Sequence, residues 1–370
     1  MNKLKRKNKS DKIAEEIVKE IKSPLRKESK NKILIPSGST LLNLACSDNY
    51  EGAFVAGTIV NLIGDTSAGK SFLALTILAE ICNNKSFDGY DLYYDDVEKS
   101  LEFNLEKLFG KNFIKRVKLN YSTYAEEVAE NLFGLTVGKK IKPFISIIDS
   151  WDALKSKYEE NKEKINIGKR KRGQEEEGSF GDGKAKLLHK ICRQSITGIE
   201  KTNSLLIIVS QTKDNWGFDA RFNPKIVTGG NAIKFFPSHR VWLTIISKIP
   251  VKKIDIGIWT RIKVIKNKFT GKRRNIDIPI YDDYGIDDLT SCVKFLNSES
   301  GRERWKTKTR EIDGKSITAI DATELDVFLK EKSLVRYIED NSFENELRQI
   351  VANAWKEIED SVLLNRKSKY

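Results

Sequence analysis

Eight residues in the first fifth of the chain have the types and spacing of a phosphate-binding loop. Residues 64 to 71 read GDTSAGKS and fit GxxxxGK[ST], between an apolar run, TIVNLI, and a helix-like run, FLALTILAEIC. Glycines let successive backbone N–H groups turn toward phosphate oxygens, and the amino end of the following helix adds a partial positive charge. The pattern predicts an ATP site, against the alternative of a glycine-rich strand-to-helix turn. The predicted ATP-binding residues are Gly64, Asp65, Thr66, Ser67, Ala68, Gly69, Lys70 and Ser71.

Two side chains of this loop and one distant carboxylate have predicted chemical roles. The Lys70 ammonium would contact the β and γ phosphates, and the Ser71 hydroxyl would ligate Mg²⁺. Asp149 closes the apolar run FISIID, which suits a carboxylate that holds the same ion through water. The alternative for Asp149 is the N-cap of a helix that begins near Trp151.

Hydrolysis of ATP also needs a carboxylate that polarises the attacking water. The segment YYDDVEKSL offers three, Asp95, Asp96 and Glu98, just past a second strand-like run. We select Glu98 as the candidate, although spacing alone does not separate it from its two neighbours.

Short apolar runs, separated early in the chain by helical segments, would position these residues. Several of the runs are apolar without alternation, as in strands that are buried on both faces. The predicted fold class is therefore α/β with a mostly parallel sheet. The strand candidates are 58–63, 91–95, 117–120, 144–149, 205–210, 241–246 and 258–266, and the long helical segments are 71–84, 98–109 and 184–200.

The ends of the chain differ in composition from the middle. Apolar residues at helical spacing within 12–22 predict a short amphipathic helix after a basic tail, so 1–32 is a predicted N-terminal arm. Residues 33–298 form the predicted core. The remaining residues, 299–370, are nearly neutral and place an apolar stripe on one helical face, which predicts a small C-terminal α-rich subdomain.

Composition excludes several classes of protein. The chain has 370 residues and no run near the ~18 consecutive apolar residues of a membrane helix, and no apolar region follows the basic start as in a signal peptide. Its four cysteines are far apart and it has only two histidines, so neither a disulfide framework nor a zinc site is predicted. These features favour a reduced cytoplasmic compartment.

Positive charge is concentrated in two segments. Residues 1–32 carry 12 basic and 5 acidic side chains, a net +7, and residues 248–274 carry 10 and 1, a net +9. Residues 299–370, in contrast, hold 14 basic and 15 acidic side chains. Clustered positive charge favours a polyanionic partner such as nucleic acid, because neutralised phosphates release counterions. The alternative is a lysine-rich solvated surface.

Taken together, the motifs resemble those of the RecA-type recombinases, over roughly residues 33 to 298. Besides GDTSAGKS, the matching segments are DVEKSL, ISIIDSWDAL, GQEEEGSFGDGKAKLLHKICRQSI, VSQ followed by FNPKIVTGGNAIKFFPSHRV, and IKVIKNKFTGKRR, in the family's order. The resemblance implies a RecA-like P-loop ATPase core. The C-terminal region, with its RERWKTKTR segment, looks more like the phage-encoded UvsX branch than like bacterial RecA.

The resemblance also implies roles for four residues. Glu98 becomes the catalytic glutamate, because DVE matches the family's acid-x-Glu after its second strand. Gln211 becomes the switch that senses the γ phosphate. Lys266 and Lys268 become lysines offered in trans to the ATP of a neighbouring protomer, where they stabilise charge on the transferred phosphoryl group. Without the family, both lysines would be read as solvated charges at a strand edge.

Two DNA-binding loops follow from the same resemblance, at about 155–183 and 212–228. The first is longer than in bacterial RecA and contains a basic run suited to phosphate contact. The second follows Gln211 and ends at paired glycines. The predicted DNA-binding residues are Lys169, Arg170, Lys171, Arg172, Lys213, Trp216, Phe218, Arg221, Phe222, Gly229 and Gly230.

The function implied by the resemblance is that of an ATP-dependent DNA recombinase. It would form homo-oligomeric helical filaments on single-stranded DNA with ATP and Mg²⁺, and pair that strand with a homologous duplex. Single-strand-binding or mediator proteins would be additional partners, a membrane would not, and the location would be the cytoplasm, or the host cytoplasm for a phage protein. Two alternatives stay open: a ring-forming DNA helicase of the same core fold, and a recombination mediator ATPase without strand exchange.

Overall fold

A computed structural model describes residues 32–138, 141–174, 182–215, 221, 225–227, 230–364 and 366. From Leu34 onward the chain forms one compact unit. The predicted N-terminal arm lies outside the described residues except for Lys32, as do four predicted DNA contacts, Trp216, Phe218, Phe222 and Gly229. Among the helices that are described, each is too short or too polar to cross a bilayer.

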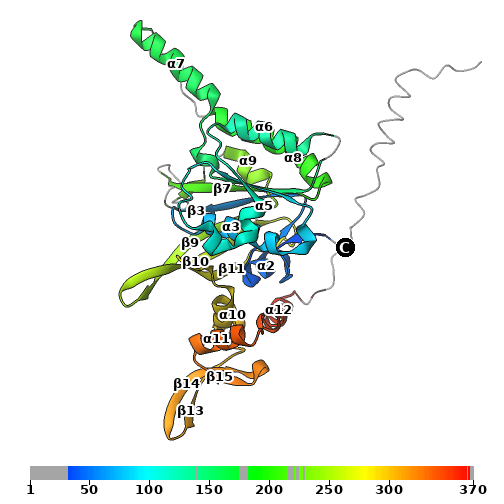
Figure 1. Ribbon diagram of the computed structural model, residues 1–370, viewed down its shortest axis with the longest axis vertical. Coiled ribbons are helices and arrows are strands. Elements are labelled where there is room, and N and C mark those ends of the chain that lie inside the picture. The colour runs from blue at the N-terminus through cyan, green and yellow to red at the C-terminus, as the bar shows by residue number, and fades with distance from the viewer. Residues whose placement is uncertain are drawn as a thin grey trace, which may run out of the picture. The chain divides into compact units, whose positions relative to one another are not determined.

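The core is built on a ten-stranded sheet with the order β12-β11-β10-β9-β3-β7-β6-β4-β5, with β8 paired to the end of β7 (Figure 1). Its central pairs are parallel, whereas β9 to β12 run antiparallel along one edge. The α/β prediction is therefore confirmed. The strands are β3 (Thr58–Gly64), β4 (Asp91–Asp96), β5 (Val117–Asn120), β6 (Phe144–Asp149), β7 (Leu205–Asp214), β8 (Lys225–Val227), β9 (His239–Val251), β10 (Ile254–Asn267), β11 (Asn275–Tyr281) and β12 (Gly285–Ile286).

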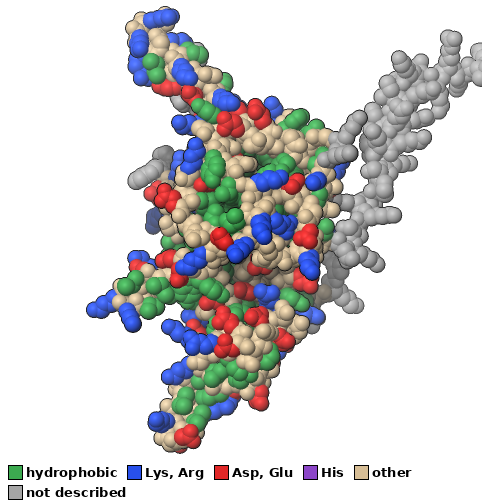
Figure 2. All heavy atoms as spheres, viewed as in Figure 1, with side chains coloured by type: hydrophobic (Ala, Val, Ile, Leu, Met, Phe, Trp, Pro, Cys, Tyr) green, Lys and Arg blue, Asp and Glu red, His purple; other side chains and the backbone are tan. Residues whose placement is uncertain are grey.

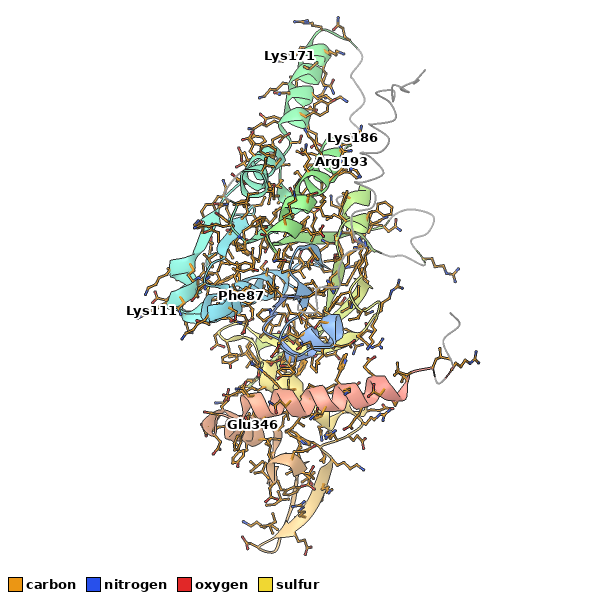
Figure 3. The ribbon with its side chains drawn as sticks, turned by 90° about the vertical axis from the view of Figure 1, so that its right-hand side faces the viewer. Phe87, Lys111, Lys171, Lys186, Arg193 and Glu346 are labelled. Carbon is orange, nitrogen blue, oxygen red and sulfur yellow. The ribbon has the colours of Figure 1, made fainter. Side chains whose placement is uncertain are left out.

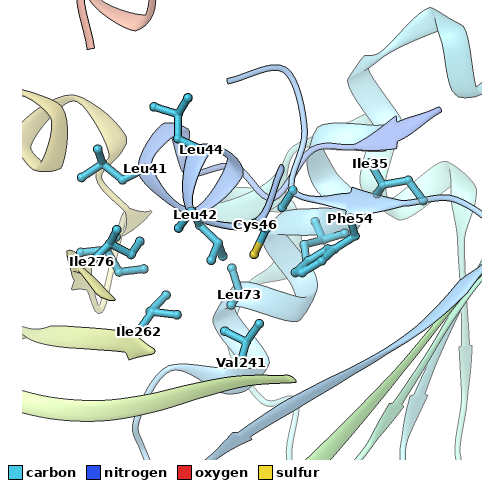
Figure 4. Close-up of a cluster of buried hydrophobic side chains, with 14 of the residues drawn as sticks. Ile35, Leu41, Leu42, Leu44, Cys46, Phe54, Leu73, Val241, Ile262 and Ile276 are labelled. Carbon is cyan, nitrogen blue, oxygen red and sulfur yellow. The ribbon is translucent and has the colours of Figure 1, made fainter. Parts of the chain in front are cut away.

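Helices cover both faces of this sheet, and two apolar clusters hold them there. One cluster contains α3, α2 and the C-terminal helices, and Figure 4 shows Leu41, Leu42 and Leu44 of α2 in it. The other lies under α6, α8 and α9. The helices are α2 (Thr40–Ser47), α3 (Lys70–Asn83), α4 (Leu105–Phe109), α5 (Lys111–Arg116), α6 (Ala125–Thr136), α7 (Lys157–Lys171), α8 (Asp182–Lys201), α9 (Gly230–Phe235), α10 (Asp288–Asn297), α11 (Glu331–Asp340) and α12 (Glu344–Ser361).

The helix predicted over 98–109 is wrong in its first half. Only 105–109 are helical, because the Asp96 carboxylate accepts hydrogen bonds from the backbone N–H groups of Ser100 and Leu101, both at 3.2 Å. These bonds fold the chain after β4 into a turn, in which Lys99 has a φ of 54°. A side chain that binds nearby amides in this way competes with helix formation.

The C-terminal part contains the predicted helices and also a small sheet that was not predicted. The three antiparallel strands are β13 (Thr307–Ile312), β14 (Lys315–Ala322) and β15 (Val327–Leu329). The helix α12 then packs its apolar face against α2 and α10. The boundary at residues 298 and 299 stays a prediction.

Glu359 joins the last helix to the core. Its side chain accepts two hydrogen bonds from the Arg274 guanidinium, at 2.5 and 2.6 Å, and forms an ion pair with Lys272 at 3.0 Å. The bonds from Arg274, and then the charges of both partners, lower the pKa of Glu359 from 4.5 to about 2. The ionised carboxylate is therefore more stable in the folded protein than in the unfolded chain.

We expect Glu359→Gln to lower the free energy of unfolding at pH 7 by about 2 kcal/mol, because the charge-assisted hydrogen bonds from Arg274 are weakened. Since the folded pKa is depressed, the contribution of Glu359 is present above pH 4.5 and is lost as the pH falls toward 2. Urea unfolding at several pH values should show that the difference in the free energy of unfolding between wild type and variant disappears as the pH falls from 4.5 toward 2. Glu357→Gln is the control, because this exposed glutamate of the same helix pairs with Arg304 at the surface. An equal loss of stability in Glu359→Gln and Glu357→Gln would contradict the stabilising role of Glu359.

Candidate nucleotide site and DNA-binding segments

The predicted phosphate loop connects β3 to α3, as the pattern requires. Gly64 ends the strand, and Gly69 precedes Lys70 with a left-handed φ of 92°. A Cβ on Gly64 would lie 2.6 Å from the Leu243 carbonyl oxygen, and one on Gly69 would lie 2.3 Å from Cδ1 of Ile280. Both glycines of the motif are therefore needed for close packing against neighbouring strands, besides any contact with phosphate.

Lys70 is buried in this loop with its ammonium near several carboxylates. Its Nζ donates to the Asp65 carbonyl oxygen at 2.6 Å. Burial lowers the pKa of Lys70, although the charges of Asp149 and Glu98 act in the opposite direction. A partly desolvated cation at the start of a helix is a suitable partner for phosphate oxygens.

Asp149 lies at the carboxyl end of β6, next to the hydroxyl groups of Ser71 and Tyr94. Both hydroxyls hydrogen bond its carboxylate, and the Tyr94 hydroxyl lies 2.6 Å from Oδ2. Burial nevertheless raises the pKa of Asp149. The N-cap alternative is wrong, because the short 3-10 helix that follows, Trp151–Ala153, begins after Ser150. Nothing in the sequence pattern had marked Tyr94.

The donors gathered here fit Mg²⁺. Ser71 and Asp149 supply only oxygen atoms, the ligands that this ion prefers. In the described part of the chain, no group of three or more His, Cys, Asp or Glu side chains is placed to hold a metal ion.

Of the three carboxylates at the end of β4 and just after it, only Glu98 is exposed. Asp95 is buried and accepts bonds from the N–H and hydroxyl groups of Ser122, at 2.8 and 2.6 Å, while Asp96 holds the turn described above. Glu98 is exposed, and its Oε1 accepts bonds from Ser150 Oγ and from Gln211 Nε2, each at 2.7 Å. The geometry favours Glu98 over its two neighbours.

Gln211 is held by a second contact that sequence analysis missed. Its backbone N–H donates to Asp152 Oδ2 at 2.6 Å, and burial raises the pKa of Asp152. The Lys184 ammonium in turn binds the carbonyl oxygens of Asp152 and Leu154, both at 2.8 Å. The segment after β6 thus links Gln211 to the first turn of α8.

Lys266 and Lys268 lie at the end of β10 and just after it, and β9 separates β10 from β3, the strand that leads into the phosphate loop. Lys266 pairs with Arg240, which pairs with Asn61 on β3, three residues before the strand ends at Gly64. Both ammonium groups donate to the Phe235 carbonyl at the end of α9, at 2.9 and 3.1 Å. Burial, with the charges of Lys268 and Arg240, lowers the pKa of Lys266 to about 8.

The first predicted DNA-binding segment contains a long helix, α7, capped at its start by the Ser156 side chain. Its last turn carries Lys169, Arg170 and Lys171, with Arg172 just after it. Figure 2 shows Lys and Arg side chains gathered over the outer part of α7, and Figure 3 places Lys171 there. The predicted basic run is thus presented at the outer end of a helix.

The second predicted segment begins as a β-hairpin rather than as a loop. The strand β7 continues to Asp214 and pairs with β8, with Thr212 opposite Val227 and Asp214 opposite Lys225. Lys213 and Arg221 are exposed. Gly230 begins α9 with a φ of 65°, which favours glycine at this turn.

A cavity in the described structure lies elsewhere. It measures about 980 Å³ and is lined by residues of β10, β11, α10 and α12, including Trp259, Phe295 and Trp355. None of the residues predicted to bind nucleotide or DNA lines it.

Comparison with known proteins identifies a matching family model and similar proteins. A family model described as the RecA N-terminal domain matches residues 8–287. The chain is 29% identical over 263 residues to Protein RecA of Ehrlichia ruminantium, an alignment that covers 70% of this chain and 66% of that protein. It is 28% identical over 256 residues to Protein RecA of Nautilia profundicola, covering 68% and 66%, and 27% identical over 264 residues to Protein RecA of Colwellia psychrerythraea, covering 70% and 69%. The chain thus spans about 66% of the length of the first of these relatives.

Proposed function

Since this chain belongs to the RecA family, we propose that it is an ATP-dependent DNA recombinase that forms filaments on single-stranded DNA and promotes strand exchange. The observation that carries the proposal is the 2.7 Å hydrogen bond between Gln211 and Glu98. It connects the carboxylate proposed for hydrolysis with the residue directly before the segment proposed to bind DNA. Whether ATP or its product is bound could therefore affect the DNA-binding hairpin through the contact between Glu98 and Gln211.

In the proposed mechanism, the phosphate loop and Lys70 bind the β and γ phosphates of ATP. Ser71 and Asp149 would hold Mg²⁺, the latter through water, and the bound ion would neutralise charge on the phosphates. Glu98 accepts a proton from the attacking water. Gln211 exchanges its bond to Glu98 for one to the γ phosphate, which changes the position of β7 where the hairpin begins.

Single-stranded DNA would lie against the basic end of α7 and the hairpin of β7 and β8. The residues proposed to contact it are Lys169, Arg170, Lys171, Arg172, Lys213 and Arg221, together with Gly230 at the start of α9. Positive side chains of this kind bind the phosphate backbone without sequence preference.

The function is tested by electron microscopy and by strand exchange. With single-stranded DNA and a non-hydrolysable ATP analogue, we expect helical filaments, and with ATP and a homologous duplex, an exchanged strand. Lys70→Ala is the control and should give no exchange, because its phosphate contact is lost. Closed hexamers would instead indicate a helicase. DNA-stimulated ATP hydrolysis without exchanged product would indicate a mediator.

A further inference from the structure

Asp65 lies inside the phosphate loop, and its side chain contacts both β7 and β8, the two strands of the second DNA-binding segment. Its Oδ1 accepts a hydrogen bond from the Thr212 hydroxyl at the end of β7. Its Oδ2 lies 2.5 Å from the Lys225 ammonium on β8. Asp65 is 147 and 160 residues away from these partners in sequence, so only the strand order brings them together.

These contacts favour the ionised carboxylate of Asp65. Burial alone would raise its pKa, but the hydrogen bonds from Lys225 and Thr212 and the charge of Lys225 outweigh burial and lower the pKa. The Asp65 and Lys225 side chains are 37% and 39% exposed, so the pair is only partly solvated. An isolated surface ion pair contributes little to stability. The relevance of this pair is instead that it joins the phosphate loop to β8.

Asp65 also contacts Lys70, the residue proposed to bind the phosphates. The Lys70 ammonium donates to the Asp65 backbone carbonyl at 2.6 Å. A phosphate that takes Lys70 as its partner would compete with that bond. Because the same residue also holds Thr212 and Lys225, a change at its carbonyl can reach these two contacts.

We propose that Asp65 is a positioning residue that transmits nucleotide occupancy to the base of the DNA-binding hairpin, through Thr212 and Lys225 and in parallel with Gln211. The inference rests on the proposed function, because it requires nucleotide-dependent DNA binding. It assigns to Asp65 a role for its side chain, whereas the phosphate-binding motif requires only its backbone.

The test measures how much nucleotide changes DNA affinity in the full chain. Fluorescence anisotropy of a labelled oligothymidine gives the Kd for DNA with and without ATPγS and Mg²⁺, and the ratio of the two values is the coupling. We expect Lys225→Gln to reduce the coupling about tenfold, with an unchanged Kd for a fluorescent ATP analogue, since Lys225 lies outside the phosphate loop. Lys225→Arg, which keeps the charge, should retain most of the coupling.

Two further variants distinguish loss of the contact between Asp65 and Lys225 from a general loss of positive charge on the hairpin. Asp65→Asn should reduce the coupling as Lys225→Gln does, and the double variant should be no worse than either single one, because both remove the same contact. Lys213→Gln removes a neighbouring positive charge of the hairpin whose side chain lies on the other face of β7. It should weaken DNA binding equally with and without nucleotide, and so leave the coupling unchanged.

The outcomes distinguish this inference from the proposed function. Wild-type protein with a coupling of about one would overturn the proposed function itself. Strong coupling in wild type, retained within about twofold in Lys225→Gln and Asp65→Asn, would overturn the inference alone. Gln211→Ala should lower the coupling independently. The double variant of Gln211→Ala and Lys225→Gln should therefore show a smaller coupling than either single variant.

Discussion

Glu98→Gln is expected to lower the rate of ATP hydrolysis by about 10²- to 10⁴-fold, the usual contribution of a positioned general base. The amide keeps the size of the side chain and its bond to Ser150 but cannot take a proton from water. ATP and DNA binding should persist, because the phosphate loop and the hairpin are unaltered. A coupled assay of phosphate release, with and without single-stranded DNA, measures the effect.

The matched control is Glu102→Gln. Glu102 is an exposed glutamate four residues further along the same turn, so its substitution makes the same chemical change nearby. It should hydrolyse ATP at close to the wild-type rate. Normal turnover by Glu98→Gln would show that another carboxylate activates the water.

The double substitution of Lys266 and Lys268 by alanine is expected to reduce ATP hydrolysis by about 10³-fold or more, as loss of a trans cation does in related phosphoryl-transfer sites. In their own protomer Lys266 is level with Asn61 of β3, with β9 between them, roughly 10 Å along the strand direction from Gly64 by the rise per residue. Both lysines also bind the end of α9. Their proposed ATP is therefore that of a neighbour.

Mixing two inactive proteins tests the trans role. A protomer without the lysines still has Glu98 and an intact phosphate loop, and a Glu98→Gln protomer still has the lysines. In a filament with head-to-tail contacts, roughly a quarter of the interfaces would join an intact loop to intact lysines. ATP hydrolysis should rise on mixing to a similar fraction of the wild-type rate. Mixed filaments that stay inactive would contradict a trans role.

Several elements were predictable because their signal is local. The phosphate loop is contiguous, and the strands of the parallel sheet are short apolar runs, since burial on both faces leaves no polar alternation. The helix α7 was missed for the opposite reason. Its sequence, KYEENKEKINIGKRK, has no apolar stripe, so periodicity did not indicate a helix. The strand β13 is exposed along its length and gave no buried-face pattern either.

The sequence by itself predicted an ATP site at residues 64 to 71 and an α/β fold. Through resemblance, it also indicated which family to expect. The tertiary structure supports the choice of Glu98, which the resemblance had made, because it shows that Asp95 and Asp96 already accept hydrogen bonds from Ser122 and Ser100. It also brought Tyr94 to Asp149, and Asp65 to Lys225. The physical reason is that a motif is set by neighbouring residues, whereas these contacts depend on the order and register of strands far apart in the chain.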